Sequence, residues 1–217
     1  MEVEIIFFQK KYQLASSHLD KKLQVNSQNV SQIIMNLKFL NPLDDCEVYL
    51  VAPVDNWSDS PIFLAKLAIS WAKLENKILI IDANLRNPSQ HVFFNLNRDY
   101  GLTNALSDLE GIEKYIQVSV IERISVLTAG EYAPNPVELL NSKKMNQLIV
   151  WAKKNFDLVL VNVPPFLEYT DGRVVALQSD QIVLLTKFGK TKNYDFRKVV
   201  NLLKEIEKKK TGVIVIE

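Results

Sequence analysis

The chain has 217 residues, enough for one α/β domain and too few for two of ordinary size. Its 26 Lys and Arg residues against 25 Asp and Glu residues leave a net charge of +1, which argues against a nucleic-acid binder or a membrane-surface binder, since both need a basic excess. A single cysteine excludes an intramolecular disulfide, and two histidines argue against a histidine metal centre. Because no apolar run approaches the roughly 20 residues of a membrane span and no signal peptide opens the chain, we expect a cytosolic protein without a span of its own.

Short apolar runs alternate with longer helical patterns along the chain. The runs are nearly continuous in Val, Ile and Leu, as in strands that are covered on both faces of a parallel sheet. The predicted strands are 47–52, 77–82, 124–127, 158–163, 181–186 and 212–216. The predicted helices are about 27–40, 61–74, 137–154 and 192–209. This alternation predicts an α/β fold with a doubly wound, mostly parallel sheet and helices on both faces.

The sequence shows no internal repeat, low-complexity tract or linker. We therefore expect one domain over residues 27–217, preceded by an N-terminal arm or edge segment over residues 1–26. Within that segment, EVEIIFF is either an edge strand or a terminal arm. The lysine run at 208–210 is expected at a helix C-terminus, where the macrodipole favours cations.

Polar residues follow three of the predicted strands. These stretches read PVDNWSDSP at 53–61, IDANLRNP at 81–88 and VNVPP at 161–165. In an open α/β sheet, ligands bind beyond the carboxyl ends of the strands, so the three stretches together predict a site.

The three stretches, in this order, resemble the bacterial tyrosine kinases of capsule and exopolysaccharide assembly, a branch of the deviant Walker-type ATPases that includes MinD and ParA. APNPVELLNS at 133–142 and Thr170-Asp171 match further motifs of that family. The resemblance runs from about residue 27 to the C-terminus. It implies a P-loop NTPase-like, three-layer α/β/α fold and, in active members, tyrosine kinase and ATPase activity with ATP and magnesium.

The phosphate-binding loop of the family departs most from its pattern. The first hundred residues contain no glycine, and all six glycines lie at or beyond Gly101. Glycine lets backbone N–H groups wrap phosphates, and the family's lysine neutralises their charge. Aligned backwards from IDANLRNP, the loop falls on Trp57, Ser58, Asp59, Ser60 and Pro61. Without glycines and lysine, this degenerate loop is not expected to bind a nucleotide.

The acidic residues that the resemblance implies for magnesium are also depleted. Asn162 replaces the Walker B aspartate, and Asn84 replaces the second aspartate of the preceding motif. An amide supplies no negative charge to magnesium and cannot act as a base. Asp82 survives as the one plausible metal remnant, with Arg86 and Asp171 around it.

Several of these residues allow two interpretations. Asp82 is either a hydrogen-bonded structural acid, which we favour, or a metal ligand, and Arg86 pairs with either Asp82 or Asp171. Trp57 either plugs the nucleotide pocket or is an exposed interface anchor. The turn at 189–191 reads Gly-Lys-Thr but lacks the glycine that a full phosphate loop needs at Leu184.

The resemblance and its departures together predict a catalytically inactive relative of these kinases, without catalytic residues, metal or cofactor, that regulates or scaffolds polysaccharide production. The expected partner is a membrane-embedded chain-length regulator or an active kinase homologue, and that partner could recruit the protein to the inner face of the membrane. The family's oligomerisation signature would fall on Gln28, Ser31 and Ile34, none of which matches, so we expect a monomer or a small oligomer. The alternatives are a residual kinase or ATPase that binds ATP and magnesium, and a sensor whose altered pocket binds another small ligand.

Overall fold

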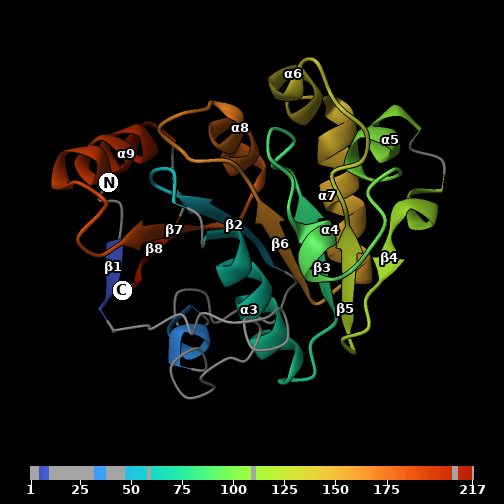
Figure 1. The fold of residues 1–217 in the computed structure, drawn as a ribbon, viewed down its shortest axis with the longest axis horizontal. Coiled ribbons are helices and arrows are strands. Elements are labelled where there is room, and N and C mark those ends of the chain that lie inside the picture. The colour runs from blue at the N-terminus through green and yellow to red at the C-terminus, as the bar shows by residue number, and fades with distance from the viewer. Residues whose placement is uncertain are drawn as a thin grey trace.

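A computed structural model of the chain describes residues 5–9, 32–37, 47–57, 60–108, 111–206 and 210–216. Within these residues, eight strands form one twisted sheet in the order β1-β8-β7-β2-β6-β3-β5-β4 (Figure 1). All neighbouring strands pair in parallel except β4 and β5, which are antiparallel. The strands are β1 (Ile5–Gln9), β2 (Glu47–Pro53), β3 (Ile78–Asp82), β4 (Gln117–Val118), β5 (Ile124–Leu127), β6 (Leu158–Asn162), β7 (Gln181–Lys187) and β8 (Lys210–Ile216).

Helices cover both faces of this sheet (Figure 1). Residues 32–37 are also helical. The labelled helices are α3 (Ser60–Ala72), α4 (Gln90–Phe93), α5 (Leu102–Ser107), the 3₁₀ helix η1 (Ile112–Tyr115), α6 (Pro136–Leu140), α7 (Lys143–Asn155), α8 (Asp171–Gln178) and α9 (Asn193–Glu205). The predicted doubly wound α/β fold is therefore confirmed.

Two hydrophobic cores lie on opposite faces of the sheet, because successive side chains of a buried strand point to opposite sides. On β2, Val48 and Leu50 join the core beneath α5 to α9, whereas Tyr49 and Val51 join the core beneath α3 and residues 32–37. This alternation explains why β2 reads as a continuous apolar run: neither face is left to solvent.

The predicted helix over 137–154 is wrong in one respect, because the structure divides it into α6 and α7. Asn141 ends α6, and the Ser142 side chain accepts a hydrogen bond from the backbone N–H of Met145, which begins α7 with an N-cap. Ser at this position favours a new helix start over continuation, since its hydroxyl satisfies an otherwise unpaired N–H. Pro136 begins α6, as a proline at the first helical position should.

The last predicted helix is also too long. α9 ends at Glu205, and Lys210 is the first residue of β8. The other two lysines of the run, at 208 and 209, lie outside the described residues. β8 then pairs with β7 on one side and β1 on the other. Residues 5–9 thus form an edge strand, the first of the two interpretations of EVEIIFF.

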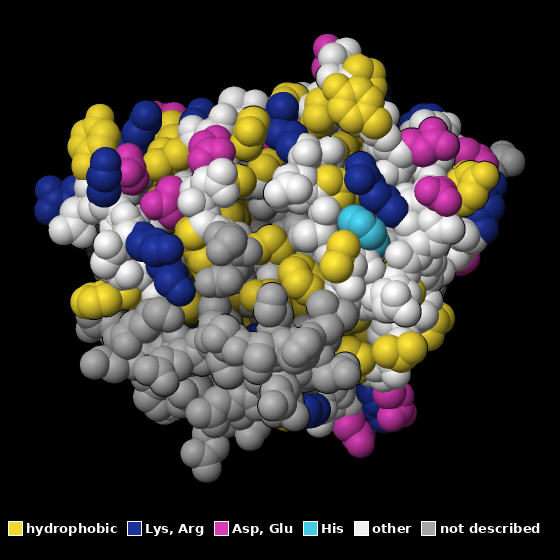
Figure 2. Space-filling model, in the orientation of Figure 1, with side chains coloured by type: hydrophobic (Ala, Val, Ile, Leu, Met, Phe, Trp, Pro, Cys, Tyr) yellow, Lys and Arg dark blue, Asp and Glu magenta, His cyan; other side chains and the backbone are white. Residues whose placement is uncertain are grey.

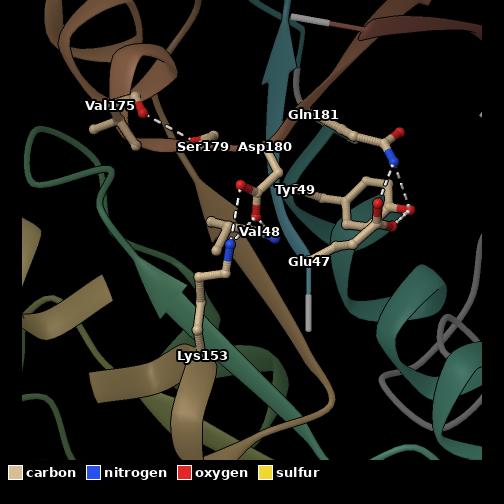
Figure 3. Close-up of polar contacts among 8 residues, drawn as sticks. All are labelled: Glu47, Val48, Tyr49, Lys153, Val175, Ser179, Asp180 and Gln181. Carbon is tan, nitrogen blue, oxygen red and sulfur yellow. Dashed lines mark hydrogen bonds and ion pairs between the residues drawn. The ribbon is translucent and has the colours of Figure 1, made fainter. Parts of the chain in front are cut away.

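At the amino-terminal edge of the central strands, polar side chains form hydrogen bonds and an ion pair with one another (Figure 3). Asp180, which precedes β7, accepts hydrogen bonds from the Val48 backbone N–H at 2.8 Å and from Lys153 Nζ at 2.8 Å. The pair joins α7 to β2 and β7.

A second group at the same edge surrounds Tyr49 (Figure 3). Gln181 Nε2 donates to Glu47 Oε1 at 2.8 Å and to the Tyr49 hydroxyl at 3.2 Å, and that hydroxyl donates to Glu47. Burial, followed by the contact with Glu47, raises the pKa of Tyr49. These contacts link several polar groups at this edge, although Gln181 Oε1 is buried without a hydrogen-bond partner among the described residues. In an open α/β sheet, ligands bind at the opposite, carboxyl edge.

None of the helices in the described part of the chain combines the length and the apolar character needed to cross a bilayer.

Candidate functional site

The three polar stretches that the sequence singled out meet at the carboxyl edge of β2, β6 and β3. These strands are adjacent, and their register places Asn162 beside both Val51 and Asp82. A cavity of about 240 Å³ lies there, below the range of about 300–1,000 Å³ that is usual for drug-sized ligands. It is lined by Pro53, Asn56, Trp57, Ser60, Pro61, Asn84, Arg86, Asn87, Asn162, Val163, Pro164, Pro165, Glu168 and Tyr169.

Asp82, at the end of β3, is fully buried and accepts four hydrogen bonds from the protein. Asn162 Nδ2 donates to Oδ1 at 2.8 Å, and the Asn84 backbone N–H is 3.4 Å from the same oxygen. The backbone N–H groups of Ser89 and Gln90 donate to Oδ2 at 3.0 and 2.9 Å. Since a carboxylate has about four lone-pair sites, these donors use its full acceptor capacity.

The protonation of Asp82 is governed by two opposed effects. Burial raises the pKa of the carboxyl group above its ordinary value, while hydrogen bonds from Asn162 and from three backbone N–H groups lower it. Burial is the larger effect. The same donors that stabilise the carboxylate tie β3 to β6 and to the start of α4, which is the structural role favoured from the sequence.

The two asparagines have fixed amide orientations. Asn162 directs its Nδ2 to Asp82, and Asn84 directs its Oδ1 to the backbone N–H of Asn87 at 3.1 Å. Both side chains are buried and line the cavity. Each therefore keeps one amide atom, the Oδ1 of Asn162 and the Nδ2 of Asn84, without a hydrogen-bond partner in the described part of the chain.

Arg86 pairs with Asp171 rather than with Asp82. Arg86 Nε lies 3.1 Å from Asp171 Oδ1, and Nη2 lies 3.1 Å from Oδ2, so the pair is bidentate. Asp171 opens α8 and its side chain is fully buried, whereas a third of the Arg86 side chain is exposed. The guanidinium carbon also lies 4.4 Å from the centre of the Tyr169 ring. The ion pair and the ring hold the guanidinium in place and neutralise its charge.

The residues aligned with the phosphate loop lead from β2 into α3. Trp57 is 8% exposed and packs in the core beneath α3, so it is not the exposed anchor of the second interpretation. Ser60 is the first residue of α3 and donates to the Trp57 carbonyl, and Pro61 follows it inside the helix. Ser58 and Asp59 lie outside the described residues, as do Gln28 and Ser31.

The Gly-Lys-Thr turn lies between β7 and α9, away from the cavity lining. Thr191 Oγ1 donates to Asp55 Oδ1 and accepts from the Lys187 backbone N–H, both at 2.9 Å. Gly189 has a φ of 70° in the turn. The threonine is thus used to fasten this turn to the loop after β2.

Two residues of the site, Tyr169 and Gln90, are not among those predicted from the sequence. Tyr169 contacts Arg86 from a position directly before the Thr170-Asp171 pair, and that proximity was the available signal. Gln90 is fully buried and donates from Nε2 to the Pro61 carbonyl at 3.1 Å, which joins the start of α4 to α3. No sequence signal marks this contact, because the two residues belong to different helices and are 29 positions apart.

The APNPVELLNS stretch forms a separate opening at the same edge of the sheet. A cavity of about 480 Å³ lies over it, lined by residues of α5, by residues 131–135 and by Glu138, Leu139 and Ser142. On the face drawn in Figure 2, basic and acidic side chains are intermixed among the coloured residues. The described residues contain no group of three or more His, Cys, Asp or Glu side chains arranged to hold a metal ion.

The fold and the position of the site place the chain among P-loop-type α/β proteins. The cell-division ATPase MinD of Pyrococcus furiosus has the same fold, with a TM-score of 0.65 at 19% identity over 76% of this chain and 69% of MinD. The kinase domain of the Escherichia coli tyrosine kinase ETK superposes with a TM-score of 0.82 at 27% identity over 88% of this chain and 76% of the domain. The chimerical protein CapA2B2 gives 0.81 at 25% identity over 87% and 83% of the two chains.

Sequence comparison agrees with these structures. The tyrosine-protein kinase YwqD of Bacillus subtilis is 31% identical over 191 residues, which span 88% of this chain and 81% of YwqD. The tyrosine-protein kinase Etk of Escherichia coli K12 is 37% identical over 123 residues, 57% of this chain and 17% of Etk. The chain belongs to the bacterial tyrosine kinase family. No family model matches it.

Proposed function

We propose that the protein is a catalytically inactive member of the bacterial tyrosine kinase family, a pseudokinase that regulates or scaffolds capsular or exopolysaccharide production. The observation that carries the proposal is the environment of Asp82. Its carboxylate accepts four hydrogen bonds from the protein, so no acceptor site is left for a magnesium ion or its water shell.

The neighbouring side chains support the same conclusion. Asn162 and Asn84 stand where the family motifs have aspartates, and an amide neither balances the charge of magnesium nor accepts a proton as a base. Arg86, the cation of the cavity lining, already forms a bidentate pair with a buried aspartate. The residues present therefore do not fit a magnesium–nucleotide complex.

The loop and the cavity add a steric argument. Ser60 replaces the phosphate-binding lysine, Pro61 supplies no backbone N–H, and the bulky Trp57 side chain is buried beside the cavity. The remaining cavity of about 240 Å³ is smaller than the pockets that take drug-sized ligands.

Thermal unfolding with and without magnesium and ATP tests the proposal. A ligand that binds only the folded state stabilises it by about 2.7 kcal/mol at a hundred times its Kd. For a chain of this size each kcal/mol raises Tm by roughly 2–4 °C, so a competent site would raise Tm by about 5–10 °C. We expect no reproducible shift, whereas YwqD serves as the positive control in the same buffer.

A rise of that size with both ATP and ADP would contradict the proposal and favour a residual ATP-binding kinase. A Trp57→Gly variant separates the causes. If Trp57 alone blocks the pocket, the variant gains nucleotide binding; if the lost acids and lysine also matter, it remains without a shift.

We further propose that the protein acts through a protein partner at the inner face of the membrane, either a membrane-embedded chain-length regulator or an active kinase homologue. The support is family membership together with the altered site. Affinity purification from the native cell, with quantitative mass spectrometry, should enrich one of these two classes. Enrichment of neither would contradict the partner assignment without bearing on nucleotide binding.

A further inference from the structure

We propose that the cavity at the carboxyl edge of β2, β6 and β3 binds a small, neutral, polyhydroxylated molecule of the size of a single sugar unit. The inference rests on the proposed function, since it requires that the cavity no longer takes a nucleotide. It concerns the ligand of the altered site and not the partner protein.

The first support is the arrangement of amide atoms in the cavity lining. Asp82 uses the Nδ2 of Asn162, and the Asn87 backbone uses the Oδ1 of Asn84. On these two buried asparagines, the atoms that remain are an acceptor, Asn162 Oδ1, and a donor, Asn84 Nδ2. A hydroxyl group both donates and accepts, so neighbouring hydroxyl groups on one molecule satisfy both atoms.

The second support is charge. Arg86 is neutralised by Asp171 through two short contacts, so the lining offers no uncompensated cation from this residue. An anion would in addition meet the Oδ1 of Asn162 and the Glu168 side chain, an acid that lines the cavity, and both repel it. Phosphate and carboxylate ligands are therefore disfavoured, and a neutral ligand is not.

The third support is the combination of polar and aromatic lining in a small volume. Trp57 and Tyr169 line the cavity together with Asn56, Asn84 and Asn162. Aromatic rings pack against the C–H groups of a polyhydroxylated ring, while the amides bind its hydroxyl groups. The volume of about 240 Å³ suits a ligand smaller than a nucleotide.

The experiment is a binding titration of the full chain with named probes. Glucose, galactose, N-acetylglucosamine and glycerol represent the proposed class, and inorganic phosphate, adenosine and magnesium–ATP represent the excluded ones. Isothermal titration measures affinity, and ¹⁵N-edited spectra of the wild type follow the side-chain amide signals of Asn84 and Asn162, with those of Asn141 as the remote reference. We expect at least one sugar or glycerol to bind with millimolar affinity, to shift the signals of Asn84 and Asn162, and to leave those of Asn141 unmoved.

The matched variants are Asn84→Ala and Asn141→Ala. Asn84→Ala removes the cavity donor and should weaken binding about fivefold, the loss of one hydrogen bond of about 1 kcal/mol. Asn141, in the turn between α6 and α7, is exposed and outside the cavity lining, so its variant should bind as the wild type does. If Asn84→Ala does not fold, the amide shifts of the wild type still decide the question.

Each other outcome overturns the inference. Binding of none of the neutral probes, preferential binding of adenosine or phosphate, or sugar binding that leaves the two amide signals unmoved would each contradict it. The proposed function fails separately, through a Tm rise with magnesium–ATP. An absence of sugar binding together with an absence of that rise rejects the inference alone.

Discussion

At the scale of single residues, the carboxylate of Asp82 organises the site. It accepts hydrogen bonds from one side chain and three backbone N–H groups, which come from β6 and from the loop between β3 and α4. Replacing a neighbouring aspartate by Asn162 changes a repulsive carboxylate pair into a donor–acceptor pair. The substitution that removes a magnesium ligand therefore also stabilises the buried acid that remains.

The pKa of Asp82 predicts a pH dependence of stability. Burial raises the folded-state pKa above the unfolded value of about 3.9, so the folded state holds more protons between these two values. The free energy of unfolding then falls as pH rises through this window. We expect urea unfolding from about pH 4 upward to show the wild type losing stability relative to Asp82→Asn. The variant has no titratable carboxyl group at this position, so its own stability carries no such pH dependence from residue 82. A wild type that gains stability relative to the variant over this range would contradict the assignment.

Restoring the family's phosphate-binding lysine at Ser60 is a test of how much the other losses matter. Ser60→Lys should not produce phosphotyrosine, because Asn84 and Asn162 still supply no charge to hold magnesium and no base. The parts of a phosphoryl-transfer site act as a unit and their effects are not additive. Immunoblotting for phosphotyrosine after incubation with magnesium–ATP checks this, with YwqD as positive control. Robust signal from the single variant would show that the acidic residues matter less than proposed.

At the scale of elements, the close approach of α5 to the end of β5 depends on two glycines. A Cβ built on Gly101 would lie 2.2 Å from the Thr128 carbonyl oxygen, and one on Gly130 would lie 2.4 Å from Thr103 Oγ1. Leu102 and Thr103 donate from their backbones to Thr128 and Ala129, so the two segments are hydrogen-bonded as well as packed. This contact positions α5 beside the APNPVELLNS stretch.

Gly130 and Gly189 form a matched pair for a test of that packing. Both have positive φ, 83° and 70°, but a Cβ at Gly189 would meet no atom within 4 Å. Gly189→Ala should cost about 1–2 kcal/mol for the left-handed conformation alone. Gly130→Ala carries the same conformational cost and adds a collision worth about 1–3 kcal/mol. Chemical unfolding of both variants measures the difference in their free energies of unfolding. Equal destabilisation would show that α5 shifts to accept the added methyl group without loss of stability.

At the scale of the whole molecule, one parallel sheet separates two cores and leaves its carboxyl edge for the site. The amino edge is closed by the contacts of Asp180 and Tyr49 (Figure 3). On the α3 side, Ile34 is fully buried in the core, and it is one of the three positions of the family's oligomerisation signature. Because its side chain is buried in the core, Ile34 cannot supply an intersubunit contact in a ring-shaped oligomer.

The assembly prediction follows from this burial. The isolated protein should be a monomer or a small oligomer, because Ile34 is unavailable and Gln28 and Ser31 carry no charge. Light scattering coupled to gel filtration at micromolar concentration measures the particle mass. A stable particle of octamer size would contradict the prediction and would point to ring contacts made by other residues.

Much of the fold could be predicted because its signals are local. Continuous Val, Ile and Leu runs mark the central strands, and their boundaries match the structure within two residues. The division at Asn141 and Ser142 was missed, since APNPVELLNS and the following residues read as one helical pattern until the Ser142 cap is seen. α8 was also missed, because its eight residues are too few to show a clear period.

The sequence by itself determined the family, the order of the central strands and the three stretches that meet at the site, because motifs and hydrophobic periods are contained in short segments. Only the tertiary structure decided that Arg86 pairs with Asp171, that Trp57 is buried, and that Asp82 is saturated by Asn162 and the α4 backbone. The physical reason is distance along the chain: Asp82 and Asn162 are 80 residues apart, and Arg86 and Asp171 are 85 apart. Hydrogen bonds act over about 3 Å, so the choice of partner is made by the tertiary fold and not by the residues themselves. The register of β3 and β6 brings Asp82 to Asn162, and the packing of the loop after β3 against the start of α8 brings Arg86 to Asp171.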